Sequence, residues 1–125
     1  MSVIAAGLLS KPKLVLYTDD DGITEEALER YRYRKPVLGK VVRIELQFNE
    51  PLLTKGDRGW NMLIEGEQVL ALSGCNCGYG GEGPRGAKTI LDDIGIPEDQ
   101  AKQVFVSRYL LFTIINDSWV SEAVL

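Results

Sequence analysis

The residues best suited to chemistry lie between Ser73 and Gly86, a stretch that holds both cysteines and six of the thirteen glycines. Glycines let backbone N–H groups approach an anion closely, and a helix that starts after such a turn adds partial positive charge. The sequence indicates a helix from Pro84 onward, with basic side chains in its first turns. It therefore predicts an anion site made of Gly78, Tyr79, Gly80, Gly81, Gly83, Arg85, Gly86 and Lys88.

Two known phosphate-binding patterns do not account for this stretch. No Gly-Lys-Ser/Thr follows at the spacing of a Walker loop. The spacing Gly78-x-Gly80-x-x-Gly83 matches a dinucleotide fingerprint, which also needs an acid about twenty residues on, at a strand end. Asp99 lies in that range but at a predicted helix start, so we discount this interpretation. The alternative to an anion site is a tight connector whose glycines only solve backbone geometry.

Cys75 and Cys77 suggest a different chemistry. Thiols in a loop near a helix start can have lowered pKa values and be reactive. The chain has no histidine to act as their base, and two cysteines are too few for a zinc site within one chain. The alternative is that both are small, semi-buried loop residues. We predict no catalytic residue, no metal ligand and no cofactor, and the sequence leans away from an enzyme.

Three charged segments complete the candidates. Residues 30–35 interleave bases with two tyrosines, a pattern that suits single-stranded nucleic acid but is also that of a normal helix C-terminus, which we favour. Of the two binding roles, we prefer a secondary anion clamp to a nucleic-acid groove. Asp19 to Asp21 lack the downstream ligands of a calcium loop, so a solvated turn is expected. Residues 54–59 suggest a mobile binding loop or a surface pair of Asp57 with Arg58.

Composition narrows the class of protein. A chain of 125 residues with 45% apolar residues predicts one domain, over residues 1–125. A formal charge of −4 argues against binding to double-stranded nucleic acid, which requires a basic surface. No signal peptide or membrane span is recognisable, so we expect no membrane association and a cytoplasmic location.

Periodicity and turn signals place the elements around the glycine stretch. We expect an α+β fold: a single compact domain with a mainly antiparallel sheet of about four to six strands and two or three helices. One helix should be capped by Thr24 and end before Pro36. A hairpin should turn at Gly66 with positive φ, and Gly95 should cap the helix that starts at Pro84. The expected strands are 13–17, 40–49, 60–64, 68–72 and 109–115; a helix is expected over 97–105, and a strand or helix over 119–125.

The loop also carries a resemblance. Residues 78–84 read Gly-Tyr-Gly-Gly-Glu-Gly-Pro and are followed by Ala87, Ile90-Leu91, Phe105 and Trp119. This pattern resembles a small uncharacterised family of phage and bacterial proteins that carries Gly-Tyr-Gly-Gly-x-Gly-Pro after a strand and before a helix. The resemblance covers about residues 60–120 and excludes the paired cysteines and the N-terminal forty residues. It implies a compact α+β domain with this loop, and no particular activity.

The sequence thus favours a small binding protein that holds an anionic small molecule, a nucleotide or nucleotide-derived signal, and sequesters it. The amides of residues 80–86 would bind phosphate, Arg85 would pair with it and Tyr79 would stack on a base or sugar. The alternative is a protein–protein interaction module, such as a phage or host inhibitor or a structural factor. A homo-oligomer is compatible with either function.

Overall fold

The computed structural model describes residues 13–17, 20–48, 52–53 and 59–125. The helical elements are α2 (Thr24–Leu38), α3 (Glu82–Ile94), α4 (Glu98–Ala101) and the 3₁₀ helix η1 (Lys102–Phe105). The strands are β1 (Val15–Tyr17), β2 (Arg43–Gln47), β3 (Leu52–Leu53), β4 (Gly59–Trp60), β5 (Met62–Glu65), β6 (Val69–Leu72), β7 (Tyr109–Ile115) and β8 (Ser118–Val124).

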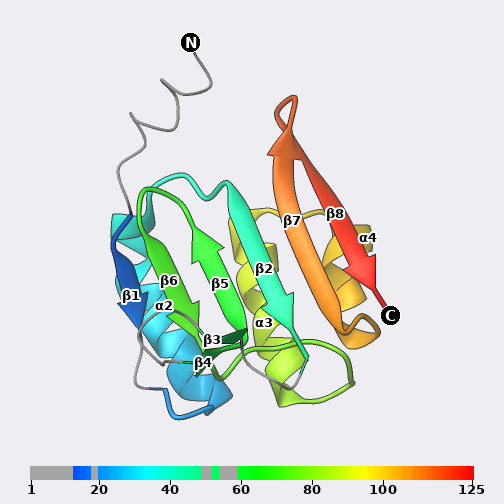
Figure 1. Ribbon diagram of the computed structural model, residues 1–125, viewed down its shortest axis with the longest axis horizontal. Coiled ribbons are helices and arrows are strands. Elements are labelled where there is room, and N and C mark those ends of the chain that lie inside the picture. The colour runs from blue at the N-terminus through cyan, green and yellow to red at the C-terminus, as the bar shows by residue number, and fades with distance from the viewer. Residues whose placement is uncertain (1–12, 18–19, 49–51, 54–58) are drawn as a thin grey trace.

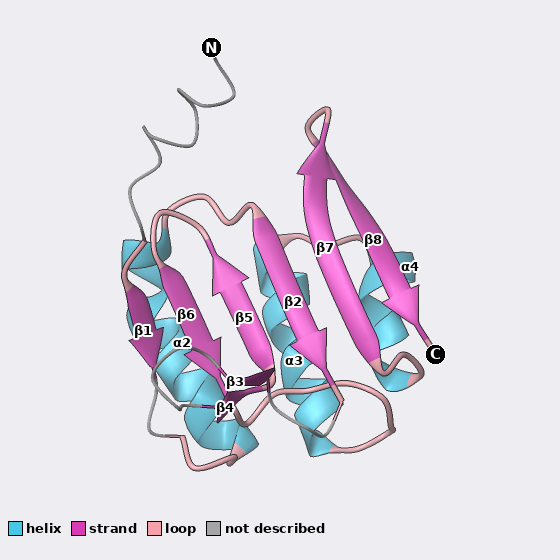
Figure 2. Ribbon diagram, viewed as in Figure 1, coloured by secondary structure: helices cyan, strands magenta, loops and turns pink. Residues whose placement is uncertain are grey.

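The described elements form two layers. Six strands make one sheet in the order β1-β6-β5-β2-β7-β8, and β3 pairs with β4 separately. Within the large sheet β1 runs parallel to β6, and the other neighbours are antiparallel. The helices all lie behind the sheet, against one of its faces (Figures 1 and 2). The predicted α+β class with a mainly antiparallel sheet is confirmed.

The core fills the space between the sheet and the helices. Along β2 the side chains of Ile44 and Leu46 are fully buried while their neighbours are half-exposed, as the alternation of this segment predicts. On α3 the stripe of Ala87, Ile90 and Leu91 is fully buried against them. Each large aliphatic side chain buried in this way contributes about 1.5–3 kcal/mol. Packing of α3 on the sheet therefore fixes the end of the glycine stretch.

Two expectations about turns are wrong. Helix α2 begins at Thr24, with Ile23 as N-cap, and continues through Pro36 to Leu38. Pro36 has no N–H to donate to the carbonyl four residues earlier in the helix, and because Pro36 is exposed, that carbonyl can bind water instead. Burial of the Leu38 side chain favours the extra turn. Gly66 does not have positive φ. Its role is close packing instead, because a Cβ there would overlap the carbonyl oxygen of Leu38.

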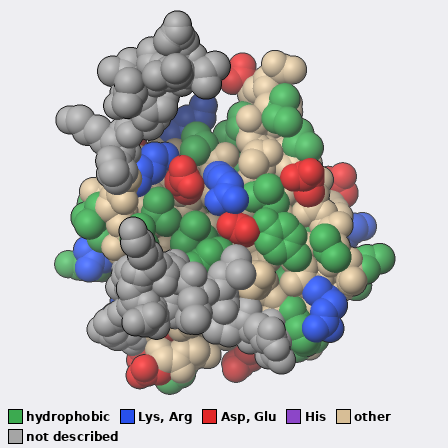
Figure 3. Space-filling model, viewed as in Figure 1, with side chains coloured by type: hydrophobic (Ala, Val, Ile, Leu, Met, Phe, Trp, Pro, Cys, Tyr) green, Lys and Arg blue, Asp and Glu red, His purple; other side chains and the backbone are tan. Residues whose placement is uncertain are grey.

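The other face of the sheet is not covered by any described helix. Figure 3 shows basic and acidic side chains interspersed among hydrophobic ones across the centre of this face. Glu45 lies 3.2 Å from the Arg43 guanidinium and accepts a 2.6 Å hydrogen bond from the Tyr109 hydroxyl. Burial, together with this carboxylate, raises the pKa of Tyr109 to about 12. Across the described ranges, no helix has the length and apolar character needed to cross a membrane.

Candidate functional site

The stretch between β6 and α3 is anchored at its start by Asp20. This carboxylate is fully buried and accepts hydrogen bonds from the backbone N–H groups of Gly22 (3.1 Å), Ser73 (2.9 Å) and Gly74 (3.2 Å), and from the Ser73 hydroxyl. The solvated turn expected for Asp19 to Asp21 is therefore wrong at Asp20, and Asp19 lies outside the described residues. Asp20 instead fixes the point at which the chain leaves the sheet.

Both cysteines are fully buried and reduced. Burial, and secondarily the charge of Asp20, raises the pKa of Cys75 to about 12. Burial raises the pKa of Cys77 to about 12 as well. A reactive cysteine needs a lowered pKa and exposure to solvent, so the geometry favours a packing role for both thiols. They are more deeply buried than the semi-buried loop residues that the sequence suggested.

Hydrogen bonds hold the next part of the loop to its neighbours. The Asn76 amide nitrogen donates to the carbonyl of Phe48 at 2.9 Å, and the backbone N–H of Gly78 donates to Val104 at 2.7 Å. Gly78 has a φ of +105°, and a Cβ there would overlap the Phe48 ring. The buried Oδ1 of Asn76 has no donor among the described residues. Glycine is thus required at position 78 by the contact with Phe48, and its N–H already donates to Val104, so it is not free for a ligand.

Three further glycines of the predicted site lie under neighbouring side chains. A Cβ at Gly81 would overlap the Tyr79 ring. A Cβ at Gly83 would overlap the Oδ1 of Asn76, and one at Gly86 would overlap the Cγ2 of Thr24. Thr24 belongs to the first turn of α2, so Gly86 is the position at which α2 and α3 approach closely. Gly81, Gly83 and Gly86 therefore serve packing, which is the alternative that the sequence left open for these glycines.

In the remainder of the loop Gly80 and Glu82 are exposed, Gly81 is half-buried and Gly83 is buried. Helix α3 starts at Glu82, two residues before the predicted Pro84, with Gly81 as its N-cap. The first N–H bonded into the helix is that of Arg85, which donates to Gly81 at 3.1 Å. Among the described residues, no acceptor is found for the N–H groups of residues 80–83. Pro84 has no N–H. The start of α3 thus leaves a run of neighbouring backbone donors free.

Tyr79 stands beside these donors. Its side chain is 42% exposed and packs edge-on against the Phe48 ring, with centroids 5.9 Å apart. The Arg108 guanidinium lies over the same ring, 4.3 Å from its centroid. Phe48 and Arg108 were not among the residues predicted for the site. The signal for Phe48 was its place at the end of an alternating strand, whereas the sequence gives no sign that Arg108 lies near the loop.

The two predicted cations differ in their surroundings. The Lys88 ammonium lies 2.9 Å from the carboxylate of Asp92 and 2.8 Å from that of Glu98, and these partners raise its pKa. Arg85 is exposed, and its guanidinium has no ion pair within the described part of the chain. Arg85 is therefore free to meet a ligand, whereas Lys88 is neutralised by its neighbours.

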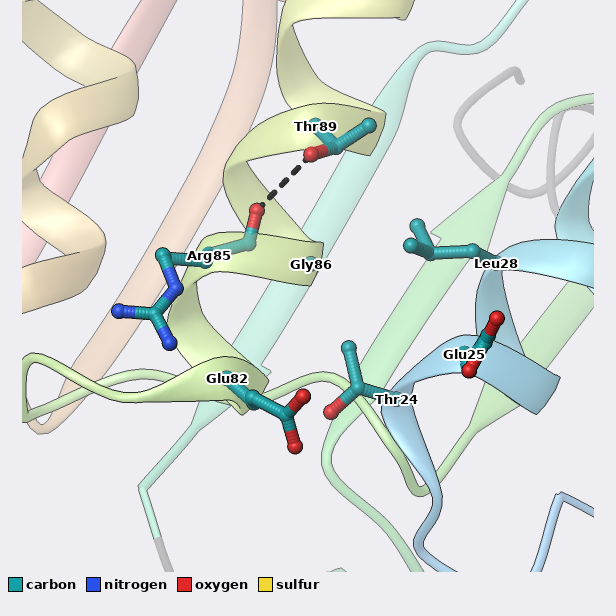
Figure 4. Close-up of a pocket in the computed structure, with 7 residues that line it drawn as sticks. All are labelled: Thr24, Glu25, Leu28, Glu82, Arg85, Gly86 and Thr89. Atoms are coloured by element: carbon teal, nitrogen blue, oxygen red, sulfur yellow. Dashed lines mark hydrogen bonds between the residues drawn. The ribbon is translucent and has the colours of Figure 1, made fainter.

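A hollow of about 270 Å³ lies between the N-terminal turns of α2 and α3. In Figure 4 the Glu82 carboxylate points toward Thr24, while the Arg85 side chain extends away from Thr24 and Glu25. The carboxylates of Glu25 and Glu82 make this hollow unfavourable for an anion. The residues that line it and were not predicted are Thr24, Glu25, Leu28, Glu82 and Thr89. An anion would therefore meet Arg85 on the side that faces away from this hollow.

A second hollow, of about 570 Å³, continues along the groove between α2 and α3. The tyrosines and bases of 30–35 do not form one patch there. Tyr31 is buried and donates to Asp93 at 2.6 Å, and Lys35 pairs with the same carboxylate at 2.7 Å. Arg30 lies 3.8 Å from Glu26. The charge of Arg32, which lines the groove, also acts on Asp93, so these acidic partners weaken the expected anion clamp.

Two other possibilities raised by the sequence, a binding loop at residues 54–59 and a metal site, add no residue to the candidate site. Residues 54–58 of the expected binding loop lie outside the described residues. No group of three or more His, Cys, Asp or Glu side chains in the described ranges is arranged to hold a metal ion.

Comparisons of the chain with protein-family models, curated proteins and solved structures gave no match. The likeness of residues 78–84 to a phage and bacterial family stays a prediction, and the site has to be interpreted from its own residues.

Proposed function

We propose that the protein is a small cytoplasmic binding protein that holds an anionic small molecule, a nucleotide or nucleotide-derived signal, and sequesters it. The phosphate of this ligand would lie on the backbone N–H groups of residues 80–83, at the N-terminus of α3. The observation that carries the proposal is that these donors have no acceptor among the described residues, next to an arginine without an ion pair.

The physical basis is the partial positive charge of a helix N-terminus. The N–H groups of Glu82 and Gly83 belong to the first turn of α3 and add to its dipole, which favours a phosphate or carboxylate there, and those of Gly80 and Gly81 directly precede them in the chain. Glu82 stands in the first turn and repels anions, but its side chain points toward Thr24, whereas the Arg85 side chain extends in another direction (Figure 4). The proposed binding set is therefore narrower than the predicted one: Tyr79, Gly80, Gly81, Gly83 through its N–H, and Arg85.

Two side chains would give the site its preference for nucleotides. The Arg85 guanidinium can make paired hydrogen bonds to phosphate oxygens. The half-exposed ring of Tyr79, held by Phe48, offers a surface for a base or sugar. Arg108, whose guanidinium lies 4.3 Å from the centroid of the Phe48 ring, adds positive charge near the same loop.

The test is calorimetric titration of the full chain with mono-, di- and triphosphate nucleotides, cyclic nucleotides and inorganic phosphate. For a nucleotide that binds, Arg85→Ala should weaken affinity about 10- to 100-fold, since a charge-assisted bond contributes about 1.5–3 kcal/mol. The matched control is Arg30→Ala, which removes the same charge from α2 outside both hollows. Absence of binding across the panel, or equal affinity of wild type and Arg85→Ala, would refute the proposal.

A protein–protein interaction module is the second candidate. The groove between α2 and α3 favours it, because apolar Leu28 and Ile90 lie beside charged rims in a hollow of about 570 Å³. A partner that binds there should lose affinity on Leu28→Glu and be indifferent to Arg85→Ala. The opposite pattern would support the small-molecule site.

A further inference from the structure

Strand β8 is an edge of the large sheet, with no strand beyond it among the described residues. The strand order places β1 and β8 at the two ends, and β8 is seven residues long whereas β1 has three. Soluble proteins protect such edges with proline, lysine, bulges or very short strands. Within Ser118–Val124 there is no proline and no lysine, and Glu122 is the single charged residue. A strand of this length without these features is suited to pairing with another strand.

The ladder between β7 and β8 identifies the groups that face outward. Ile115 pairs with Ser118 across the turn of Asn116 and Asp117, which both have positive φ. Antiparallel pairs alternate between hydrogen-bonded and non-bonded positions, so Ser118, Val120, Glu122 and Val124 bond to β7. The residues whose N–H and C=O groups point away from β7 are Trp119, Ser121 and Ala123.

Part of this outer edge has a partner. The carbonyl of Trp119 accepts a 2.9 Å hydrogen bond from the side-chain amide of Gln100, and a carbonyl has a second lone pair. The backbone groups of Ser121 and Ala123 have no bond to the described residues outside the sheet ladder. Nearby, Val120 and Val124 are 39% and 58% exposed on the face opposite the helices. Unpaired donors, unpaired acceptors and exposed valines thus lie along one strand.

We propose that two copies of the chain pair through β8, antiparallel about a twofold axis at Ser121. In this register Trp119 lies opposite the partner's Ala123, and Val120 lies opposite the partner's Glu122. All residues of β8 are paired, and every outward-facing N–H and C=O meets its complement. The two sheets join into one continuous sheet, and both helical layers lie on the same side of it.

Charge and length select this register over its neighbours. An axis at Glu122 would place the two Glu122 carboxylates directly opposite each other, which is destabilising. An axis at Val120 would leave Glu122 opposite Ser118 but would pair only residues 118–122. The axis at Ser121 keeps the whole of β8 paired and separates the like charges. The edge is therefore complementary to itself, which favours a second copy over an unrelated strand as its occupant.

The test is sedimentation velocity of the full chain over a concentration series, with a pair of variants at one position. Val120→Glu places a carboxylate opposite the partner's Glu122, whereas Val120→Lys places an ammonium there. Both substitutions replace the same exposed valine by one charged side chain, so each serves as the control for the loss of the valine in the other. The twofold axis doubles each cross-strand effect, and we expect the dimer dissociation constants of the two variants to differ by about tenfold or more.

Hydrogen exchange gives an independent measurement that does not depend on a variant's folding. The amides of Ser121 and Ala123 in the wild type should become protected as the concentration rises, while the amide of Asn116 in the turn should not. A monomer at every concentration would overturn the proposal. So would a dimer in which Val120→Glu and Val120→Lys behave alike, or capture of a foreign strand without self-association.

Discussion

Substitution of Gly86 by alanine tests the close approach of α2 and α3 on which the loop depends. The new Cβ would overlap the Cγ2 of Thr24 and lie 3.2 Å from the sulfur of Cys75. Thr24 cannot easily rotate this methyl away, because its hydroxyl donates a 2.7 Å hydrogen bond to the carbonyl of Gly74. The two helices would have to separate.

The expected cost follows from two opposing effects. Overpacking in a close-packed interior costs about 1–3 kcal/mol. Replacing glycine by alanine inside a helix gains about 0.5–1 kcal/mol. We therefore expect Gly86→Ala to lower the free energy of unfolding by about 1–2 kcal/mol. For a chain of this size that corresponds to a fall in Tm of about 4–8 °C.

Urea denaturation with a double-mutant cycle measures this effect. Thr24→Ser removes the obstructing methyl and keeps the hydroxyl, so Gly86→Ala should cost less in its background, with a coupling of about 1 kcal/mol or more. Gly80→Ala is the control, since nothing lies within 4 Å of its Cβ position and its φ is not positive. It should change stability by less than about 0.5 kcal/mol. A Gly86→Ala protein as stable as wild type would refute the proposed packing.

Two further predictions concern the buried groups beneath the loop. Asp20→Asn should lower the free energy of unfolding by about 2–3 kcal/mol, because charge-assisted hydrogen bonds to Ser73 and Gly74 are lost. The control is Asp21→Asn at the exposed neighbouring residue. Equal effects of the two substitutions in urea denaturation would contradict the anchoring role of Asp20. Stability should also fall as pH rises above about 9. The unfolded state then loses thiol protons that the folded state, with a pKa of about 12 at Cys75 and Cys77, still binds. Between pH 9 and pH 10 we expect a loss of about 2 kcal/mol from the two thiols together. Cys75→Ala/Cys77→Ala should flatten this slope in urea titrations, and an unchanged slope would contradict the assignment.

The sequence predicted the fold well where a single physical signal dominates. Strand β7 has the predicted bounds, Tyr109–Ile115, because a run of β-branched and aromatic residues lies between turn signals. Gly95 caps α3 with a φ of +104°, as expected for glycine after the last apolar position. At Pro36 the local signal was overridden by tertiary packing of Leu38, which no local pattern reveals.

The site was less predictable because its residues come together from distant segments. The sequence located the loop and Arg85, and those positions follow from local spacing. It did not indicate that Lys88 would be neutralised by Glu98 across the end of α3, or that Phe48 and Arg108 would lie beside Tyr79. It also did not separate the glycines needed for packing from the others, since close approach depends on side chains such as Asn76 and Thr24.

The distinction between glycines that packing requires and glycines that it does not require bears directly on the function of the loop. Gly78, Gly81, Gly83 and Gly86 each have a neighbour that a side chain would displace, so the connector interpretation accounts for them. Gly80 has open space around its Cβ position and no positive φ, so neither packing nor backbone conformation within the described chain requires glycine there. It also lies in the run of N–H groups without acceptors. A bulky side chain at Gly80 would stand over those donors and restrict the approach of a phosphate. Gly80→Leu should therefore leave the unfolding free energy nearly unchanged while it abolishes nucleotide binding, whereas a pure connector would be indifferent to it in both respects.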